Sequence, residues 1–148
     1  MSELVNGGRV WIGRLWSGGV ATAVIAGLIA VVGIFLARGL FDVPVLAPEG
    51  AGAWGDADTV TYALSCSLAA LVATGLLHLL LVTTPRPLRF FGWIVVLATL
   101  VAAAAPFVVD SPITSKVATA IINLTVGAAT GMLLTEVAVK AVPGRGAL

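Results

Sequence analysis

The sequence predicts an all-α integral membrane protein, built as an up-down-up-down bundle of four transmembrane helices. Hydrophobic residues make up 59% of the 148 residues and charged residues only 10%, whereas about 25% of a typical soluble domain is charged. The mean hydropathy is +1.11, and four apolar stretches are each long enough to cross a hydrocarbon core of about 30 Å. We therefore expect a single membrane domain over residues 1–148, with lipid as the solvent for most of its surface.

The first expected span covers residues 17–40. The 20 residues from Gly18 to Ala37 contain one polar side chain, Thr22, and correspond to about 30 Å of helix. This stretch is longer than the hydrophobic part of a cleaved signal peptide, so we expect a retained span. Residues 41–58 follow with two prolines, three glycines and four acids, a composition that predicts an irregular outer loop.

The other three expected spans are residues 59–83, 89–109 and 113–138. Pro85 and Pro87 end the second span and redirect the chain into the third. Before the fourth span, Asp110 is a candidate N-cap and Pro112 suits a first helical turn. Both connections are short, so consecutive helices should run antiparallel.

The positions of the cationic residues predict that both termini are cytoplasmic in a plasma membrane. With four spans the termini share one side, and that side carries six cations against two, Arg38 and Lys116, on the other. The six are Arg9, Arg14, Arg86, Arg89, Lys140 and Arg145. Interfacial aromatic residues support the same boundaries. They are Trp11, Trp16 and Trp93 on the inner side and Trp54 and Tyr62 on the outer side.

Composition also argues against several classes of function. The formal net charge is +1, so no basic surface for nucleic acid is expected. The single cysteine, Cys66, cannot form an intrachain disulfide, a redox pair or a zinc site by itself. No cofactor motif and no nucleophile paired with a base is visible, which favours a non-enzymatic protein without a cofactor.

Small residues predict where the helices pack, because helices in lipid associate through close backbone approach and interhelical hydrogen bonds. Two spans repeat such residues at four-residue steps. These are Thr119, Asn123, Gly127 and Gly131 in the fourth span and Gly19, Ala23 and Gly27 in the first, with Ala26, Ala30 and Gly33 close by. We expect the two faces to contact each other. Packing within one chain is favoured, although a Gly-x-x-x-Gly pattern also occurs between two copies.

Polar residues inside the spans are candidates for a functional site. Asn123 could bind a substrate or an ion, but a hydrogen bond that joins two helices is favoured. His78, on a face with Thr74, and Glu136 are expected about 6–8 Å below the cytoplasmic boundary. If their stripes oppose each other, the pair could transfer a proton or bind a metal. A pair between Glu136 and Lys140, with side chains that reach the interface, is favoured instead.

Known four-span families can be compared residue by residue. The first span lacks the membrane-embedded glutamate of small multidrug resistance transporters. Trp54 lacks the two cysteines of a claudin loop, and Cys66 lacks the partner that a vitamin K epoxide reductase needs. The sequence resembles the small uncharacterised four-span proteins of high-GC actinobacteria, through Ala37-Arg38-Gly39, Leu76-Leu77-His78-Leu79-Leu80 and spans dominated by Ala, Gly, Val and Leu. The resemblance implies a plasma-membrane protein of such a bacterium and brings no activity with it.

We therefore expect an accessory subunit of a membrane complex, or a homo-oligomeric scaffold, because packing features are more frequent than catalytic ones. The expected partners are the lipid bilayer and another membrane protein or a second copy. The alternative is a small proton-coupled transporter or channel that uses His78, Glu136 and Asn123. An intramembrane enzyme has the least support.

Overall fold

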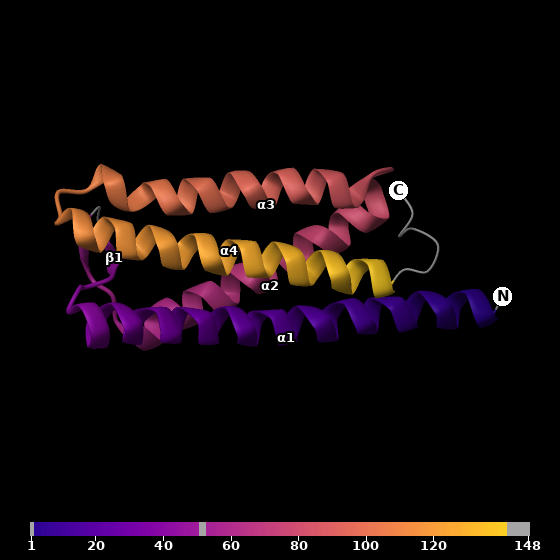
Figure 1. Cartoon of the computed structure of the whole chain (residues 1–148). Coiled ribbons are helices and arrows are strands. Elements are labelled where there is room, and N and C mark those ends of the chain that lie inside the picture. Colours follow the sequence, from indigo (N-terminus) through magenta and orange to yellow (C-terminus); the bar gives the residue numbers. More distant parts are fainter. Residues whose placement is uncertain (1, 51–52, 142–148) are drawn as a thin grey trace.

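The computed structural model describes the backbone of residues 2–50 and 53–141 and the side chains of residues 11–48 and 55–141. In these residues the chain forms four long helices and a two-stranded hairpin (Figure 1). The elements are α1 (Ser2–Phe41), β1 (Leu46–Gly50), β2 (Ala53–Asp56), α2 (Thr59–Thr83), α3 (Pro87–Ala104), the 3₁₀ helix η1 (Ala105–Val108) and α4 (Ile113–Ala141). Four helical segments are long and apolar enough to cross a membrane. The predicted all-α membrane bundle is thus confirmed.

The helices run up and down along one axis, with α4 between α1 and α3 (Figure 1). We call the end with the strands the hairpin end, and the end where α1 begins and α4 ends the terminal end. Helix α2 packs along α1, crosses behind α4 and approaches α3 toward the terminal end (Figure 1). The predicted roles of Arg9, Trp54 and Arg145 concern side chains outside the described residues.

The observed spans differ from the predicted ones mainly at their ends. Residues 59–83 coincide with α2, but α1 already begins at Ser2 and α4 continues to Ala141. The α-helical part of the third span ends at Ala104, and its last turn is the 3₁₀ helix η1. Pro106 accounts for this change, because proline has no N–H for the helical hydrogen bond and favours a tighter final turn.

Local signals define both ends of α2. Asp58 is the N-cap, and its Oδ2 accepts a hydrogen bond from the backbone N–H of Thr61 at 3.0 Å. This backbone hydrogen bond, helped by one from the Thr61 hydroxyl, holds the pKa of the Asp58 carboxyl below its usual value. At the other end Thr84 is extended, with φ −120° and ψ 139°. Pro85 follows it, and a residue before proline avoids the helical conformation.

Residues 41–58 are not the irregular loop that their composition predicts, because the two strands pair antiparallel within them. Contacts with the bundle hold this hairpin in place. The backbone N–H of Leu46 donates to Thr119 Oγ1 of α4 at 2.9 Å. Next to the strands, the backbone N–H of Ala57 donates to the Val45 carbonyl at 2.7 Å, which closes the hairpin at its base. The prediction was wrong because proline and glycine obscured two short strands whose position depends on a tertiary contact.

Arg38 joins the end of α1 to this hairpin. Its Nη2 lies 2.6 Å from Asp56 Oδ1 and also donates to the Ala57 carbonyl. Its Nη1 donates to Thr59 Oγ1, at the start of α2, at 3.2 Å. One guanidinium group thus connects α1, β2 and α2, which is the fork geometry that arginine offers.

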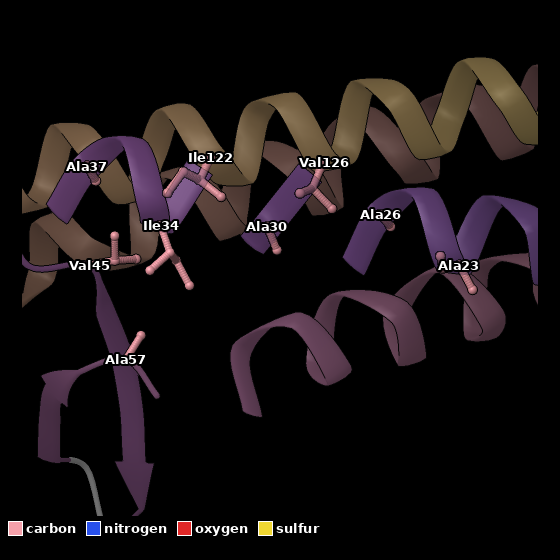
Figure 2. Close-up of a cluster of buried hydrophobic side chains, with 10 residues drawn as sticks. Ala23, Ala26, Ala30, Ile34, Ala37, Val45, Ala57, Ile122 and Val126 are labelled. Carbon is pink, nitrogen blue, oxygen red and sulfur yellow. The ribbon is translucent and has the colours of Figure 1, made fainter. Parts of the chain in front are cut away.

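Small side chains make up much of the buried core at the hairpin half. Ala26 and Ala30 of α1 are buried and belong to one cluster with Ile122 and Val126 of α4. Figure 2 shows these alanines on α1 next to the larger side chains of α4. Alanine at this contact lets two helix axes come close, as is typical of membrane bundles.

Large side chains fill the core nearer the terminal end. The four helices contribute Leu15, Leu77, Phe91 and Leu134 in chain order, and each is fully buried. Since lipid is as apolar as these side chains, their contribution to stability comes from dense packing rather than from removal from water. This cluster packs all four helices together near the turn that joins α2 and α3.

Candidate functional site: a cleft between α2, α3 and α4

The small residues of α1 lie against α2. A Cβ atom added to Gly19 would collide with the side chain of Thr74, and one added to Gly27 would lie 2.5 Å from Ser67 Oγ. Ser67 also donates a hydrogen bond to the Ala23 carbonyl at 2.9 Å. The predicted contact of this face with the fourth span is therefore wrong. Its partner is the stripe of α2 that carries Thr74.

The glycines of α4 face α3 in the same way. A Cβ atom added to Gly127 would collide with Thr99, and one added to Gly131 would lie 2.9 Å from Val95 Cγ1. A repeat of small residues thus identified two faces that make close contacts, but it does not reveal which helix each face meets. The expected contact of Gly127 and Gly131 with the first span is wrong, because both glycines face α3.

Other glycines make the contact between α1 and α4. A Cβ atom added to Gly33 would lie 2.7 Å from Ile122 Cγ1, and one added to Gly18 would collide with Val137. Gly33 is one of the small residues expected close to the packing face of the first span, whereas Gly18 is not among the predicted positions. Gly18 directly precedes Gly19, and two neighbouring glycines on a helix point about 100° apart. They can therefore serve two different partner helices.

His78 faces α1 rather than α4. The Trp16 indole Nε1 donates a hydrogen bond to His78 Nδ1 at 3.1 Å, and the Trp11 ring meets the imidazole edge-on with a centroid distance of 5.7 Å. Because Nδ1 accepts, the neutral imidazole carries its proton on Nε2. Two of the three tryptophans predicted to mark the inner boundary, Trp11 and Trp16, thus hold this histidine.

Glu136 has a separate position on α4. Its Oε2 lies 3.8 Å from Lys140 Nζ, in the favoured pairing one helical turn apart. No hydrogen bond or ion pair joins Glu136 to His78 in the part of the chain that the structure describes. The polar stripe of α2 turns toward α1, so the less favoured alternative, in which the two polar stripes oppose each other, does not occur in the described residues. Thr74 of that stripe donates instead to the Ala70 carbonyl of its own helix at 2.8 Å.

Asn123 connects three helices. Its Oδ1 accepts a hydrogen bond from the Tyr62 hydroxyl of α2 at 2.5 Å, and its Nδ2 donates to the Ala102 carbonyl of α3 at 2.7 Å. Pro106, four residues after Ala102, has no N–H to offer that carbonyl. The asparagine amide therefore takes the place of the missing helical donor, as neighbouring helices do for prolines in membranes.

A cleft of about 300 Å³ opens between α2 and α3, with α4 beneath it. Alanines line both walls, namely Ala69 and Ala73 on α2 and Ala98 and Ala102 on α3. The hydrogen bond between Tyr62 and Asn123 lies at its hairpin end. The cleft exists because α2 diverges from α3 on leaving their shared turn, as the crossing behind α4 shows (Figure 1).

Four further polar side chains line the cleft, those of Ser65, Cys66, Thr99 and Thr130. Ser65 donates a hydrogen bond to the Thr61 carbonyl of its own helix at 2.8 Å. Among the described residues, the hydroxyls of Thr99 and Thr130 have no hydrogen-bond partner. No charged residue lines the cleft, and the described residues hold no cluster of metal-ligating side chains. The arrangement can accept an apolar surface that carries hydrogen-bonding groups, and it offers no acid–base pair for catalysis.

Asn123 and Gly127 are the predicted positions that line this cleft, and the cleft itself is not predicted by the sequence. Tyr62 was placed at the outer interface as an anchoring aromatic residue, whereas its hydroxyl turns inward to Asn123. One signal was available, since Pro106 must leave a carbonyl without its helical donor and Asn123 is a membrane amide that needs partners. Thr99 and Thr130 gave no signal, because threonine is common in membrane helices and usually bonds to its own backbone.

Comparison with other proteins gives a family but no activity. No curated protein and no solved structure matches the chain. A family model matches residues 11–140, a range that includes Tyr62, Pro106, Asn123 and the whole cleft. The chain therefore belongs to DUF6069, a family of unknown function.

Proposed function

We propose that this protein is a non-enzymatic membrane component that binds a transmembrane helix of a partner in the cleft between α2 and α3. It would then act as an accessory subunit of a membrane complex, or as a scaffold if the partner is a second copy. The observation that carries this proposal is the lining of the cleft. Alanines form its two walls, and two threonine hydroxyls within it lack hydrogen-bond partners among the described residues.

The lining of the cleft matches what helices need to associate in lipid. Small residues permit close approach, and hydroxyl groups bond to carbonyl or hydroxyl groups of the neighbouring helix. Thr99 and Thr130 could supply such bonds, which a lipid acyl chain cannot accept. A volume of about 300 Å³ accommodates a row of side chains from a helix that lies across the opening, rather than the helix backbone itself.

The alternative of a proton-coupled transporter or channel has less support from the geometry. That alternative depends on His78 and Glu136 acting together with Asn123. His78 bonds to Trp16, Glu136 pairs with Lys140, and Asn123 bonds to Tyr62 and Ala102. Each candidate thus has partners of its own, and no contact among the described residues links the three into one path.

We also infer that the protein resides in the plasma membrane with both termini in the cytoplasm. The beginning of α1 and the end of α4 lie at one end of the bundle (Figure 1), and most of the cations are expected there. Those with described side chains are Arg14, Arg86, Arg89 and Lys140. The resemblance to membrane proteins of high-GC actinobacteria supports a bacterial cell membrane of that kind.

The cleft can be tested by filling it. Ala98→Leu adds a bulky side chain to the α3 wall, whereas Ala104→Leu places the same change on an exposed residue of α3 outside the cleft lining. We expect the wild type and Ala104→Leu to be isolated in native membrane nanodiscs as a stoichiometric complex, and Ala98→Leu as the protein alone.

The composition of the complex then distinguishes the two forms of the proposal. A second polypeptide in constant ratio supports an accessory subunit, and a complex of identical chains supports a scaffold. The proposal is wrong if the wild-type protein is isolated alone, or if Ala98→Leu retains the complex while its thermal unfolding matches that of the wild type.

A further inference from the structure

A second groove lies between α3 and α4, and it shares Val95, Thr99 and Gly127 with the cleft, because these residues form the contact between the two helices. Its apolar walls include Val96 and Leu100 of α3 and Leu124 and Ala128 of α4. Gly92 and Gly131 also line it. A Cβ atom added to Gly92 would meet nothing within 4 Å, whereas Gly131 packs against Val95 at the base of the groove. The volume is about 670 Å³, which is within the usual range of ligand sites.

The groove has the length of one membrane leaflet. It extends along α4 from Leu124, near the midpoint of this 29-residue helix, to Glu136, near its terminal end. Twelve residues of helix correspond to about 18 Å, and half of the hydrocarbon core is about 15 Å. A lipid whose acyl chain lies in the groove would therefore have the end of that chain near the bilayer centre and its headgroup at the level of Glu136.

Charges at the terminal end of the groove form a mixed cluster. Glu136 is the single charged residue that lines the groove, and Lys140 Nζ lies 3.8 Å from its Oε2. Both side chains are largely exposed, at 69% and 75%, so each can take a second partner. Arg89, also exposed, precedes Gly92 and Val96 by three and seven residues, which places it on the groove side of α3. It forms no ion pair among the described residues.

A carboxylate next to two cations is complementary to a zwitterion whose ammonium and phosphate are neighbours. The carboxylate of Glu136 would accept hydrogen bonds from a primary ammonium, and Lys140 and Arg89 would donate to the phosphate. A phosphatidylglycerol headgroup has no cation to place near Glu136, so its phosphate would lie beside a like charge. We propose that this groove binds one phosphatidylethanolamine molecule, with an acyl chain along α3 and α4 and its headgroup between Glu136, Lys140 and Arg89.

Lipid retention measures this directly. The full-length protein is exchanged into nanodiscs with equal amounts of phosphatidylethanolamine and phosphatidylglycerol of identical chains, and the lipids that remain after delipidation in mild detergent are counted by native mass spectrometry. We expect the wild type to retain one phosphatidylethanolamine in preference. Glu136→Gln should lower the ratio of the two retained lipids by about two- to fivefold, as for one exposed ion pair.

Two matched pairs of variants separate the headgroup from the groove. Ala128→Leu fills the groove and should reduce retention of both lipids, whereas Ala104→Leu, outside the groove lining, should not. Asp110→Asn removes an exposed acid next to the hairpin end of α4 and should leave the lipid ratio unchanged. Lys140→Gln should reduce retention of both lipids, because both carry a phosphate.

The proposal is overturned if the wild type retains both lipids equally, or if Glu136→Gln and Ala128→Leu retain phosphatidylethanolamine like the wild type. Glu136 is exposed and Ala128 faces the groove, so both variants should fold, and thermal unfolding verifies that they do. This inference does not rest on the proposed partner helix. Filling the cleft with Ala98→Leu should leave lipid retention unchanged, and blocking the groove should leave the complex intact.

Discussion

At the scale of single residues, Pro106 and Asn123 depend on each other. The proline leaves the Ala102 carbonyl without its usual donor, and Asn123 supplies one from the neighbouring helix. The sequence predicts that Asn123 must find partners in lipid, which the structure shows to be the Tyr62 hydroxyl and this carbonyl. The identity of the partners could not be predicted, because it depends on how α2 and α3 are rotated about their axes.

This dependence predicts the result of a double-mutant cycle. Asn123→Ala should lower the free energy of unfolding by about 1–2 kcal/mol, the scale of interhelical hydrogen bonds in membranes. In a Pro106→Ala background the N–H of residue 106 can bond to the Ala102 carbonyl, so the same substitution should cost less. Unfolding in mixed detergent micelles measures both values.

Tyr62→Phe is the control for this cycle, because it removes only the hydrogen bond to Asn123 Oδ1. Its cost should be the same in the presence of Pro106 and of alanine at that position. An equal cost of Asn123→Ala in both backgrounds would contradict the role assigned to the proline.

At the scale of elements, residue spacing predicts which faces pack but not which helices meet. Gly19, Ala23 and Gly27 do form a contact face, yet it meets α2 rather than α4. Every helix of a four-helix bundle has at least two neighbours, and a spacing of four residues is equally suited to each of them. The hairpin could not be predicted for a related reason. Its position on α4 depends on a hydrogen bond between Leu46 and Thr119, which are 73 residues apart in the sequence.

The contact between α1 and α2 makes a prediction about steric fit. Gly19→Ala would place a Cβ atom against Thr74 and should destabilise the bundle by about 1–3 kcal/mol, as overpacking does. Thr74→Ala removes the colliding Cγ2 and Oγ1 atoms and should restore part of this loss. Thermal unfolding of the purified protein in detergent compares the single and double variants.

Gly13→Ala is the matched control on the same helix. A Cβ atom at Gly13 would meet nothing within 4 Å, so this change should leave stability equal to or slightly above that of the wild type. If Gly19→Ala were equally neutral, the close approach of α1 and α2 at this point would be wrong.

At the scale of the whole molecule, the up-down order of the spans follows from length, hydropathy and short turns. Length, hydropathy and turn residues are properties of short segments of the sequence. The boundaries of α2 depend on such local properties and therefore match the prediction. The divergence of α2 from α3, which creates the cleft, comes from the packing of four helices at once. It therefore has no signature in any one segment.

The orientation across the membrane can be measured with single cysteines. In a Cys66→Ser background, Ser111→Cys lies at the hairpin end and Thr83→Cys at the terminal end. We expect an impermeant thiol reagent added to intact cells to label Ser111→Cys alone, with Thr83→Cys labelled only after the cells are opened. The reverse pattern would invert the predicted orientation, and labelling of both in intact cells would contradict the spans themselves.

The length of α1 has a consequence for the space next to the membrane. Its 40 residues make a rod of about 60 Å, whereas a bilayer with its headgroups measures about 40–45 Å. Unless it is strongly tilted, the rod projects beyond the lipid surface at the end where it begins. The projecting part of α1 is therefore the first part of the bundle that a molecule approaching this surface would contact. A protein bound to it would rotate together with the bundle, because the helix continues without a break into the membrane.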